Sequence, residues 1–162
     1  MTQDTVESVR EQILAQLETL AAEITHANGY WNELTAEQIT RKWIGLEQIE
    51  SAQTPFLLII SGIDGPSRPV MEHGDESDLQ VFLIGFVTSE DPDKLDREAE
   101  RFLKDVRKMI LQKGTDLTLG LSSVCDVKIV SGRADGGVVG FENWAVVELE
   151  LTVVHRYAHS SP

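Results

Sequence analysis

Apolar residues near the N-terminus recur at alternating steps of three and four, which places them on one face of a helix. Asp4 followed by Glu7 resembles a capping box, and Asn28-Gly29 is a typical stop signal. The pattern therefore predicts a helix that begins near Asp4 and ends near Asn28. Its buried stripe should comprise Val6, Val9, Ile13, Leu17, Leu20, Ala21 and Ile24.

A second helix is predicted in DPDKLDREAERFLKDVRKMILQKG. Asp91 fits its N-cap, Pro92 its first position and Gly114 its C-terminal stop. Acidic residues gather at its start and basic residues at its end, as the helix dipole favours, and a solvated outer face is enough to explain them. The predicted buried stripe is Leu95, Ala99, Phe102, Val106, Met109 and Ile110.

Two β-rich apolar runs lie between these helices. Pro55 introduces FLLIIS, a continuous run typical of a strand that is buried on both faces. LQVFLIGFVTS alternates, and both of its faces are largely apolar. Such a strand needs two coverings; one domain of this size could supply just one, and another subunit could supply the second. The two faces are Leu79, Val81, Leu83, Gly85 and Val87, and Gln80, Phe82, Ile84 and Phe86.

Two long strands are predicted in SSVCDVKIV and FENWAVVELELTVVHRY, on either side of the glycine-rich segment SGRADGGVVGF. A phosphate-binding glycine loop leads from a strand into a helix, whose N-terminus binds the phosphate. Because this segment leads into another strand, we interpret it as a hairpin with Asp135-Gly136 at its tip. Arg133 beside the tip could hold an anion or a partner's carboxylate. The apolar face of the last strand should be Val147, Leu149, Leu151 and Val153.

The order of these elements predicts an α+β fold, with an antiparallel or mixed β-sheet and two main helices packed on one face. Residues 62–78 are rich in Gly, Pro and Asp and are expected to form a loop or a wide hairpin tip. Residues 30–53 fit a short helix and a strand equally well. We expect Trp31 and Trp43 to pack in the core, although exposed tryptophans would suit an interface. The 162 residues predict a single domain, 1–162, with 158–162 as a short flexible tail.

Acidic residues outnumber basic ones by 27 to 14, which gives a net charge of -13. This charge disfavours binding to nucleic acid and to anionic membranes. The simpler explanation of the acidic charge is that it keeps the protein soluble. The other explanation is that it forms an acidic wall past which a polyanion slides without binding. The sequence has neither an apolar run of roughly 20 residues nor a signal-peptide pattern, so we expect a protein that is cytoplasmic where it is made. The lone Cys125 is expected to be a core residue in a reducing compartment.

Candidate sites for catalysis or metal binding are weak. Residues 72–78, EHGDESD, collect possible ligands but lack the ligand order of an EF-hand, so a solvated turn is favoured. His155 and His159 would share a face only on a helix, whereas this end is predicted to be strand. The serines lie in no nucleophile elbow, although a triad assembled in space leaves no trace in sequence spacing. We therefore predict no catalytic, cofactor-binding or metal site and no enzymatic activity.

Several segments in order resemble the tail terminator, or minor tail U-like, proteins of long-tailed bacteriophages and prophages. The resemblance rests on the N-terminal helix and on the Pro-led strand TPFLLIISG. It rests also on LQVFLIGFVTSEDPDKLDREAERFLKDVRKMI, where a strand gives way to a charged helix, and on the closing strand WAVVELELTVVHRY. It covers nearly the whole chain, and the family has no invariant catalytic motif.

The resemblance implies a structural virion protein whose copies form a hexameric ring. In that family the ring caps the tail tube at its head-proximal end, stops tube polymerisation and joins the tail to the head connector. The implied partners are other copies of the chain, the tail tube protein and the head–tail connector protein. DNA would pass through the channel without specific binding, and no membrane is involved. The implied location is the neck end of the virion tail, after assembly in the host cytoplasm.

On this hypothesis, glycine-rich loops at residues 62–74 and 131–140 project from the sheet toward neighbouring subunits or the tube. The alternatives are another neck or head-completion subunit, a small metal-binding module or enzyme that uses residues 72–78, and an adaptor that binds partners through its sheet edge. The candidate contact residues are Arg68, Phe82, Phe86, Arg133, Asp135 and Val138.

Overall fold

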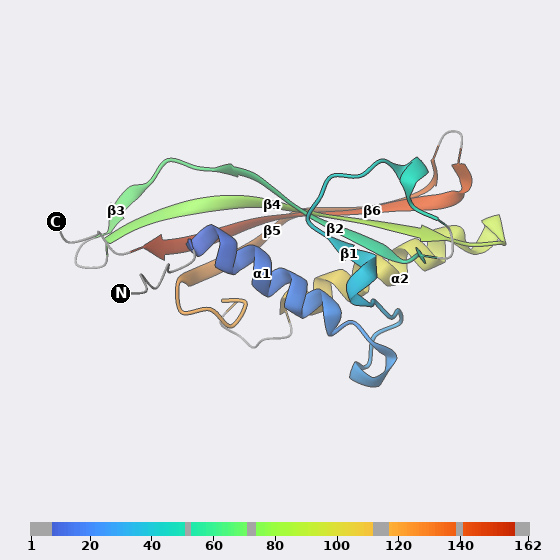
Figure 1. Cartoon of the computed structure of the whole chain (residues 1–162), viewed down its shortest axis with the longest axis horizontal. Helices are drawn as coiled ribbons and strands as arrows, with labels where there is room; N and C mark the ends of the chain where they lie inside the picture. Colours follow the sequence, from blue (N-terminus) through green and yellow to red (C-terminus); the bar gives the residue numbers. More distant parts are fainter. Residues whose placement is uncertain (1–7, 51–52, 71–73, 112–116, 139–140, 158–162) are drawn as a thin grey trace, which may run out of the picture.

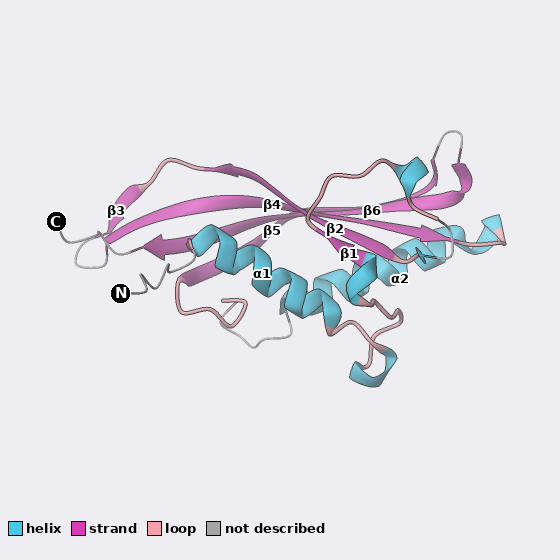
Figure 2. Ribbon diagram, in the orientation of Figure 1, coloured by secondary structure: helices cyan, strands magenta, loops and turns pink. Residues whose placement is uncertain are grey.

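The computed structural model describes residues 8–50, 53–70, 74–111, 117–138 and 141–157. Within them, long strands form one extended, twisted sheet, and both long helices lie along the same face of it (Figure 1). Coloured by secondary structure, the helical layer and the sheet layer separate clearly (Figure 2). The predicted α+β fold, with a mixed sheet and two main helices, is confirmed.

The first helix, α1, spans Val9–Ala22 and begins later than predicted. Ser8 is its N-cap, because the Ser8 hydroxyl accepts a hydrogen bond from the backbone N–H of Glu11 at 3.2 Å. The expected capping residues Asp4 and Glu7 lie outside the described residues. The buried side chains of α1 are Ile13, Leu14, Leu17, Leu20 and Ala21.

The end of α1 also differs from the prediction. Thr25 adopts an extended backbone, and its Oγ1 accepts a hydrogen bond from the N–H of Asn28, so a new 3-10 turn, η1, starts at His26–Asn28. Gly29 closes this turn in the left-handed region, with φ at 82°. The stop signal Asn28-Gly29 therefore ends η1, because α1 has already ended at Ala22 with Glu23 as its C-cap.

The second helix, α2, spans Pro92–Leu111, and its predicted start is confirmed. Asp91 precedes it, and its Oδ1 accepts a hydrogen bond from the N–H of Asp93 at 3.1 Å. Gly114, the expected stop, lies outside the described residues. The whole predicted stripe is buried, and Leu103 and Asp105 are buried with it.

The strands run in the order β1-β2-β4-β6-β5, and β3 pairs with β4. β4 and β6 pair antiparallel along most of their length at the centre of the sheet. β1 and β2 pair in parallel, so the sheet is mixed. The strands are β1 (Ile39–Thr40), β2 (Phe56–Asp64), β3 (Arg68–Val70), β4 (Gly74–Thr88), β5 (Val124–Val138) and β6 (Phe141–Tyr157).

Residues 131–138 of the glycine-rich segment belong to β5 and do not form the projecting loop that we predicted, while residues 139–140 lie outside the described residues. Asp135 pairs with Val146 and Gly136 with Ala145, so Asp135-Gly136 is not the hairpin tip. The close approach of α2 explains the glycines: a Cβ at position 132 would lie 2.6 Å from Nη2 of Arg107, and one at position 136 would overlap the Asp96 carboxylate. The absence of a side chain at these two positions lets α2 lie over β5.

The predicted loop at residues 62–78 is also mostly strand. β2 continues to Asp64, β3 occupies Arg68–Val70 and β4 begins at Gly74. The N–H of Gly65 donates a hydrogen bond to the carbonyl of Asp78 at 2.8 Å, which holds β2 and β4 together beyond their apolar residues. Backbone pairing does not require apolar side chains, so the strands run on through this polar stretch.

Two hydrophobic clusters lie on opposite faces of the sheet. The larger one fills the space between the helices and the inner face, and includes Leu79, Val81, Leu83 and Val87 of β4. The smaller one lies on the outer face, where Ile44, Leu46 and Ile49 pack over Phe56, Leu58 and Phe86. The second covering of β4 is therefore supplied, at this end, by the chain itself.

Within residues 30–50, all of which the structure describes, the chain forms η2 (Ala36–Gln38), β1 and η3 (Leu46–Gln48). The expected burial of the tryptophans is wrong, since Trp31 is 59% exposed and Trp43 is 71% exposed. Their neighbours Tyr30 and Leu34 fill the core beside the helices, and the residues after Trp43 cover the outer face instead.

Candidate functional site

The outer face of the sheet, opposite the helices, carries five of the predicted contact residues. Phe82 is half-buried on β4, where it stands opposite Ile60 of β2 and Glu150 of β6. Phe86 is only 9% exposed, because Ile49 and its neighbours cover it. Phe82 is therefore accessible to a partner, while Phe86 belongs to the packing of the subunit itself.

Arg133 and Asp135 lie on the same outer face, on the edge strand β5. Their side chains are 65% and 66% exposed. Arg133 donates a hydrogen bond to Oε2 of Glu148 at 3.0 Å, across the β5–β6 pair. Arg133, which could have held an anion or a partner's carboxylate, thus pairs with a carboxylate of its own chain. Val138 is the last residue of β5, and its side chain lies outside what the structure describes.

Arg68 lies at the far end of the same face, in a cluster of ion pairs. It contacts Glu76 at 2.7 Å and Asp78 at 2.8 Å, and Arg156 of β6 contacts Glu76 at 3.0 Å. The hydrogen bonds from Arg156 and then Arg68 hold the pKa of Glu76 below its ordinary value. The hydrogen bonds that Arg68 donates to Asp78 and Glu76 raise the pKa of Arg68. The cluster ties β3, β4 and β6 together.

The structure therefore brings Phe82, Arg133 and Asp135 to one region of the outer face and leaves Arg68 apart. Glu76, the partner of Arg68, lies six residues before Phe82 on β4. At about 3.3 Å per residue, this separates them by about 20 Å. Contacts through Arg68 and through Phe82 would involve different parts of a partner.

A polar cluster on the inner face was not found by sequence analysis. Ser77 and His155 are both buried, and Oγ of Ser77 lies 3.0 Å from Nε2 of His155. Asp64 accepts a hydrogen bond from Ser77 at 2.9 Å and lies 3.2 Å from the same ring nitrogen. The available signal was alternation, because Ser77 and His155 continue the apolar stripes of β4 and β6 with polar side chains.

The geometry of this cluster differs from that of a Ser–His–Asp triad. In a triad the carboxylate and the hydroxyl contact different nitrogens of the imidazole. Here Ser77 and Asp64 both approach Nε2 of His155. This arrangement joins the ends of β2, β4 and β6 through hydrogen bonds of the buried Ser77 and His155 with the more exposed Asp64.

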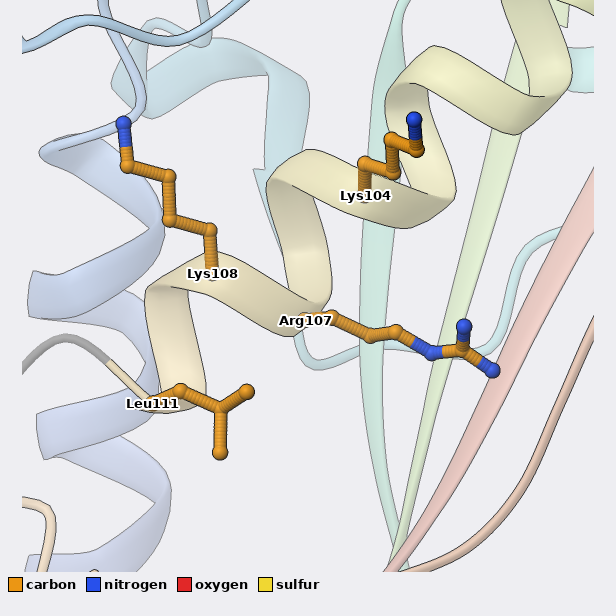
Figure 3. A pocket seen from close by; sticks show the side chains of 4 residues that line it. All are labelled: Lys104, Arg107, Lys108 and Leu111. Atoms are coloured by element: carbon orange, nitrogen blue, oxygen red, sulfur yellow. The ribbon is translucent and has the colours of Figure 1, made fainter.

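A basic surface on α2 was likewise missed, since its charges were attributed to the helix dipole. Lys104, Arg107, Lys108 and Leu111 line an open cavity of about 440 Å³. Figure 3 shows Arg107 extending over the sheet and Lys108 extending toward the chain beyond α1. The Nζ of Lys108 donates to the carbonyl of Gly29 at 2.8 Å. We call Arg101, Lys104, Arg107 and Lys108 the basic surface.

Aromatic residues border the basic surface. The Arg101 guanidinium lies 4.4 Å from the centre of the Trp31 ring, and Nζ of Lys108 lies 4.5 Å from that of Tyr30. Asp105 lies between these cations in the sequence, but it is buried and accepts hydrogen bonds from Trp31 and Asn32. The exposed charge of this half of α2 is therefore positive.

Of residues 72–78, for which a solvated turn was favoured over a metal site, the described residues 74–78 lie on β4. Glu76 and Asp78 are held by arginines, and Glu72 and His73 lie outside the described residues, as does His159. In the part of the chain that the structure describes, no group of three or more His, Cys, Asp and Glu side chains could hold a metal ion. Cys125 is half-buried, and burial raises the pKa of its thiol.

No protein-family model matches the chain, and no curated protein matches it either. Among the described helices, none has both the length and the apolar character that crossing a bilayer requires. The tail 158–162 lies outside the described residues.

Proposed function

We propose that the protein is a structural subunit of a long-tailed phage or prophage particle. Its copies form a ring that caps the tail tube, ends tube polymerisation and joins the tail to the head connector. The order α1, β2, β4, α2, β5, β6 supports this proposal, because the resemblance to tail terminator proteins rests on that order. The acidic balance of the chain, with a net charge of -13, suits a channel through which DNA passes without binding.

The outer face of the sheet is the observation that carries the proposal. Phe82 and Ile84 are half-exposed in the middle of β4, and the exposed side chains of Arg133 and Asp135 border them on β5. An apolar centre with a polar rim is the usual anatomy of a protein–protein interface. The two long helices cover the inner face, and the segment that contains η3 covers only one end of the outer face (Figure 2). The half-exposed part around Phe82 is left for a neighbouring subunit or for the tube.

The test is a tube-capping assay. The tail tube protein encoded near this chain in its genome is polymerised with and without the purified protein, and the tubes are viewed by negative-stain electron microscopy. We expect shorter tubes with a ring of extra density at one end. Tubes of unchanged length with bare ends would overturn the proposal. Binding to the connector without capping would favour the neck or head-completion subunit.

A pair of variants assigns the contact to the outer face. Phe82→Ser removes an apolar side chain from that face and should abolish capping without loss of folding. Leu111→Ser also replaces an apolar side chain by serine, at an exposed site on the helical side, and should cap normally. Equal capping by both variants would exclude Phe82 as a contact residue.

A further inference from the structure

The exposed charges differ between the two halves of α2. The first half is mixed, with exposed Lys94 and Arg97 among its acidic residues. In residues 101–111, all of them described, no exposed side chain is acidic, because Asp105 is buried. Positive charge is therefore concentrated on about three turns of one helix, in a chain whose net charge is -13. The exposed side chains of this half are Lys104, Arg107, Lys108 and Leu111.

Little of this positive charge is neutralised by the described residues. Among them, neither Lys104 nor Arg107 has an acidic side chain within ion-pair distance. Nζ of Lys108 donates to the carbonyl of Gly29, which uses one of the three donors of its ammonium group. The guanidinium group of Arg107 has five donors. The surface therefore presents positive charge and hydrogen-bond donors that a bound anion can use.

The open cavity at this surface combines charge with apolar contact. Its volume is about 440 Å³, and Leu111 lines it together with the three cations. Leu111 is exposed, and the carbon stems of the lysines add apolar area. Figure 3 shows the amino groups of Lys104 and Lys108 pointing to the same side of α2, while Arg107 reaches over the sheet. A ligand that matches this lining carries negative charge together with an apolar side chain.

We propose that the basic surface binds a short acidic segment of a partner protein, in which two carboxylates and an apolar side chain occupy alternate positions. Lys104 and Lys108 are four residues apart, about 6 Å along the helix axis. Alternate side chains of an extended chain are about 6.6 Å apart and point to one side, so two such carboxylates reach both lysines. The next alternate side chain then meets Leu111, and Arg107 adds charge on the sheet side.

A short protein segment fits this surface better than a nucleic acid does. The distance along the axis from Lys104 to Leu111 is about 10 Å, which about three extended residues cover. A long polyanion would continue onto a surface whose charge is negative overall. Phosphate groups would also leave Leu111 without an apolar partner. Trp31, exposed beside Arg101, offers a protein partner further apolar area.

This contact lies on the helical side of the subunit. The ring and the capping of the tube are proposed for the outer face of the sheet. The two proposals therefore use different surfaces, and either one can fail while the other holds.

The experiment is fluorescence anisotropy with the full chain and two labelled peptides, at about 0.05 M salt. Gly-Glu-Ser-Glu-Ser-Leu-Gly and Gly-Leu-Ser-Glu-Ser-Glu-Gly present the pattern in both chain directions. We expect at least one to bind saturably with a Kd below about 1 mM, and its glutamine counterpart to bind at least about threefold more weakly. Binding should weaken at about 0.5 M salt, since exposed ion pairs are screened. Absence of saturable binding by both peptides up to about 1 mM protein would overturn the proposal.

Variants of the chain locate the site. Lys104→Glu with Arg107→Glu should weaken binding by about tenfold or more, because attraction becomes repulsion. Leu111→Ser should weaken it by about threefold, through loss of the apolar contact. The matched control is Lys42→Glu with Lys128→Glu, which changes the net charge equally at exposed positions outside α2 and should bind like the wild type.

A second variant guards against loss of folding. Lys104→Gln neutralises one exposed side chain, and should weaken binding by about threefold while its urea unfolding midpoint stays that of the wild type. Equal binding by the wild type and by Lys104→Glu with Arg107→Glu would rule out the surface, whatever the result of the capping assay.

Other occupants of the surface are distinguished with the same variants. Free glutamate at a matching carboxylate concentration should not displace the peptide, and displacement would indicate a site for simple anions instead. Tighter binding of a labelled single-stranded oligonucleotide, lost in the double α2 variant, would assign the surface to nucleic acid. Self-association in sedimentation velocity that the same variant abolishes would assign it to a second copy. Each of these three results would overturn the proposal.

Discussion

The aromatic ring of Phe102 on α2 lies directly against the backbone of Gly85 on β4. A Cβ at position 85 would lie 2.9 Å from Cδ1 of Phe102 and 3.3 Å from Cζ. Phe102 is fully buried at this point, at the centre of the larger hydrophobic cluster. The missing side chain at Gly85 thus creates the space that seats α2 on the sheet.

Replacement of Gly85 by alanine should therefore destabilise the protein. The added methyl group must displace a packed ring, and overpacking of this kind costs about 1–3 kcal/mol in the free energy of unfolding. Urea denaturation of Gly85→Ala and the wild type measures this cost. Phe102→Leu in the Gly85→Ala background should recover part of it, because the smaller side chain leaves room for the methyl group.

Gly65→Ala is the control for the Gly85 prediction. A Cβ at position 65 would lie 3.4 Å from the Asp78 carbonyl oxygen, which is an ordinary contact. We expect its unfolding midpoint to stay close to that of the wild type. If Gly85→Ala were as stable as the wild type, the close packing of Phe102 of α2 against Gly85 would not be needed for stability, and the prediction would be wrong.

Asp105 should anchor the chain that follows α1. Its buried carboxylate accepts hydrogen bonds from the N–H of Trp31 at 3.1 Å and from the N–H and side-chain amide of Asn32, both at 2.8 Å. Asp105→Ala should lower the free energy of unfolding by about 2–4 kcal/mol, because it also leaves donors without a partner. The loss of stability in Asp105→Asn should be smaller than that in Asp105→Ala. The amide oxygen of asparagine can still accept hydrogen bonds, whereas its NH2 group cannot.

Limited proteolysis can show where the effect of Asp105 is exerted. Release of the Trp31–Asn32 segment should produce early cleavage near these residues in Asp105→Ala, identified by mass spectrometry of the fragments. Glu100→Ala, at an exposed position on the same helix, is the control and should be cleaved like the wild type. Cleavage of Asp105→Ala at the wild-type rate and sites would argue against the anchoring role.

Glu76 should make stability depend on pH on the acid side. Arg156 and Arg68 hold the pKa of Glu76 below its ordinary value of 4.5, so the folded-state pKa is lower than that of the unfolded chain. The resulting stabilisation is complete above the unfolded pKa and is lost as the pH falls through the folded pKa. Urea denaturation should show that Glu76→Gln has a lower free energy of unfolding than the wild type at neutral pH. This difference should shrink below about pH 4.

The exposed Glu142 of β6 provides the control for this pH dependence. Glu142→Gln removes a carboxylate from a position with no arginine pair among the described contacts, so it should follow the wild-type profile. A Glu76→Gln variant that differs from the wild type by the same amount at every pH would show that its effect does not arise from the titration of Glu76.

Regular alternation and helical periodicity were enough to predict much of the fold. The apolar stripe of α2 and the inner stripe of β4 are both buried where the pattern indicated. The glycine segment was misread because sequence rules treat Asp135-Gly136 as a turn signal. Glycine is required at positions 132 and 136 by a tertiary contact, because only a missing side chain lets Arg107 and Asp96 of α2 lie over β5.

The candidate surfaces were harder to predict for a related reason. A single helix shows which charges share a face, but not whether a neighbouring strand or loop neutralises them. Arg133 proved to have Glu148 opposite it, whereas Lys104 is left unpaired among the described residues. The cluster of Asp64, Ser77 and His155 depends on three strands meeting at one end of the sheet, which local sequence does not encode.

Cys125 should react slowly with alkylating reagents in the folded protein. Burial raises the pKa of its thiol, and the reactive species is the thiolate, so the folded chain holds less of it at any given pH. Alkylation by iodoacetamide at about pH 8 should be slower than in the urea-unfolded chain, and its pH midpoint should be higher. Cys125 is the only cysteine in the sequence, so mass spectrometry follows one site. Equal rates in the folded and unfolded chains would mean that the half-buried position on β5 does not protect the thiol.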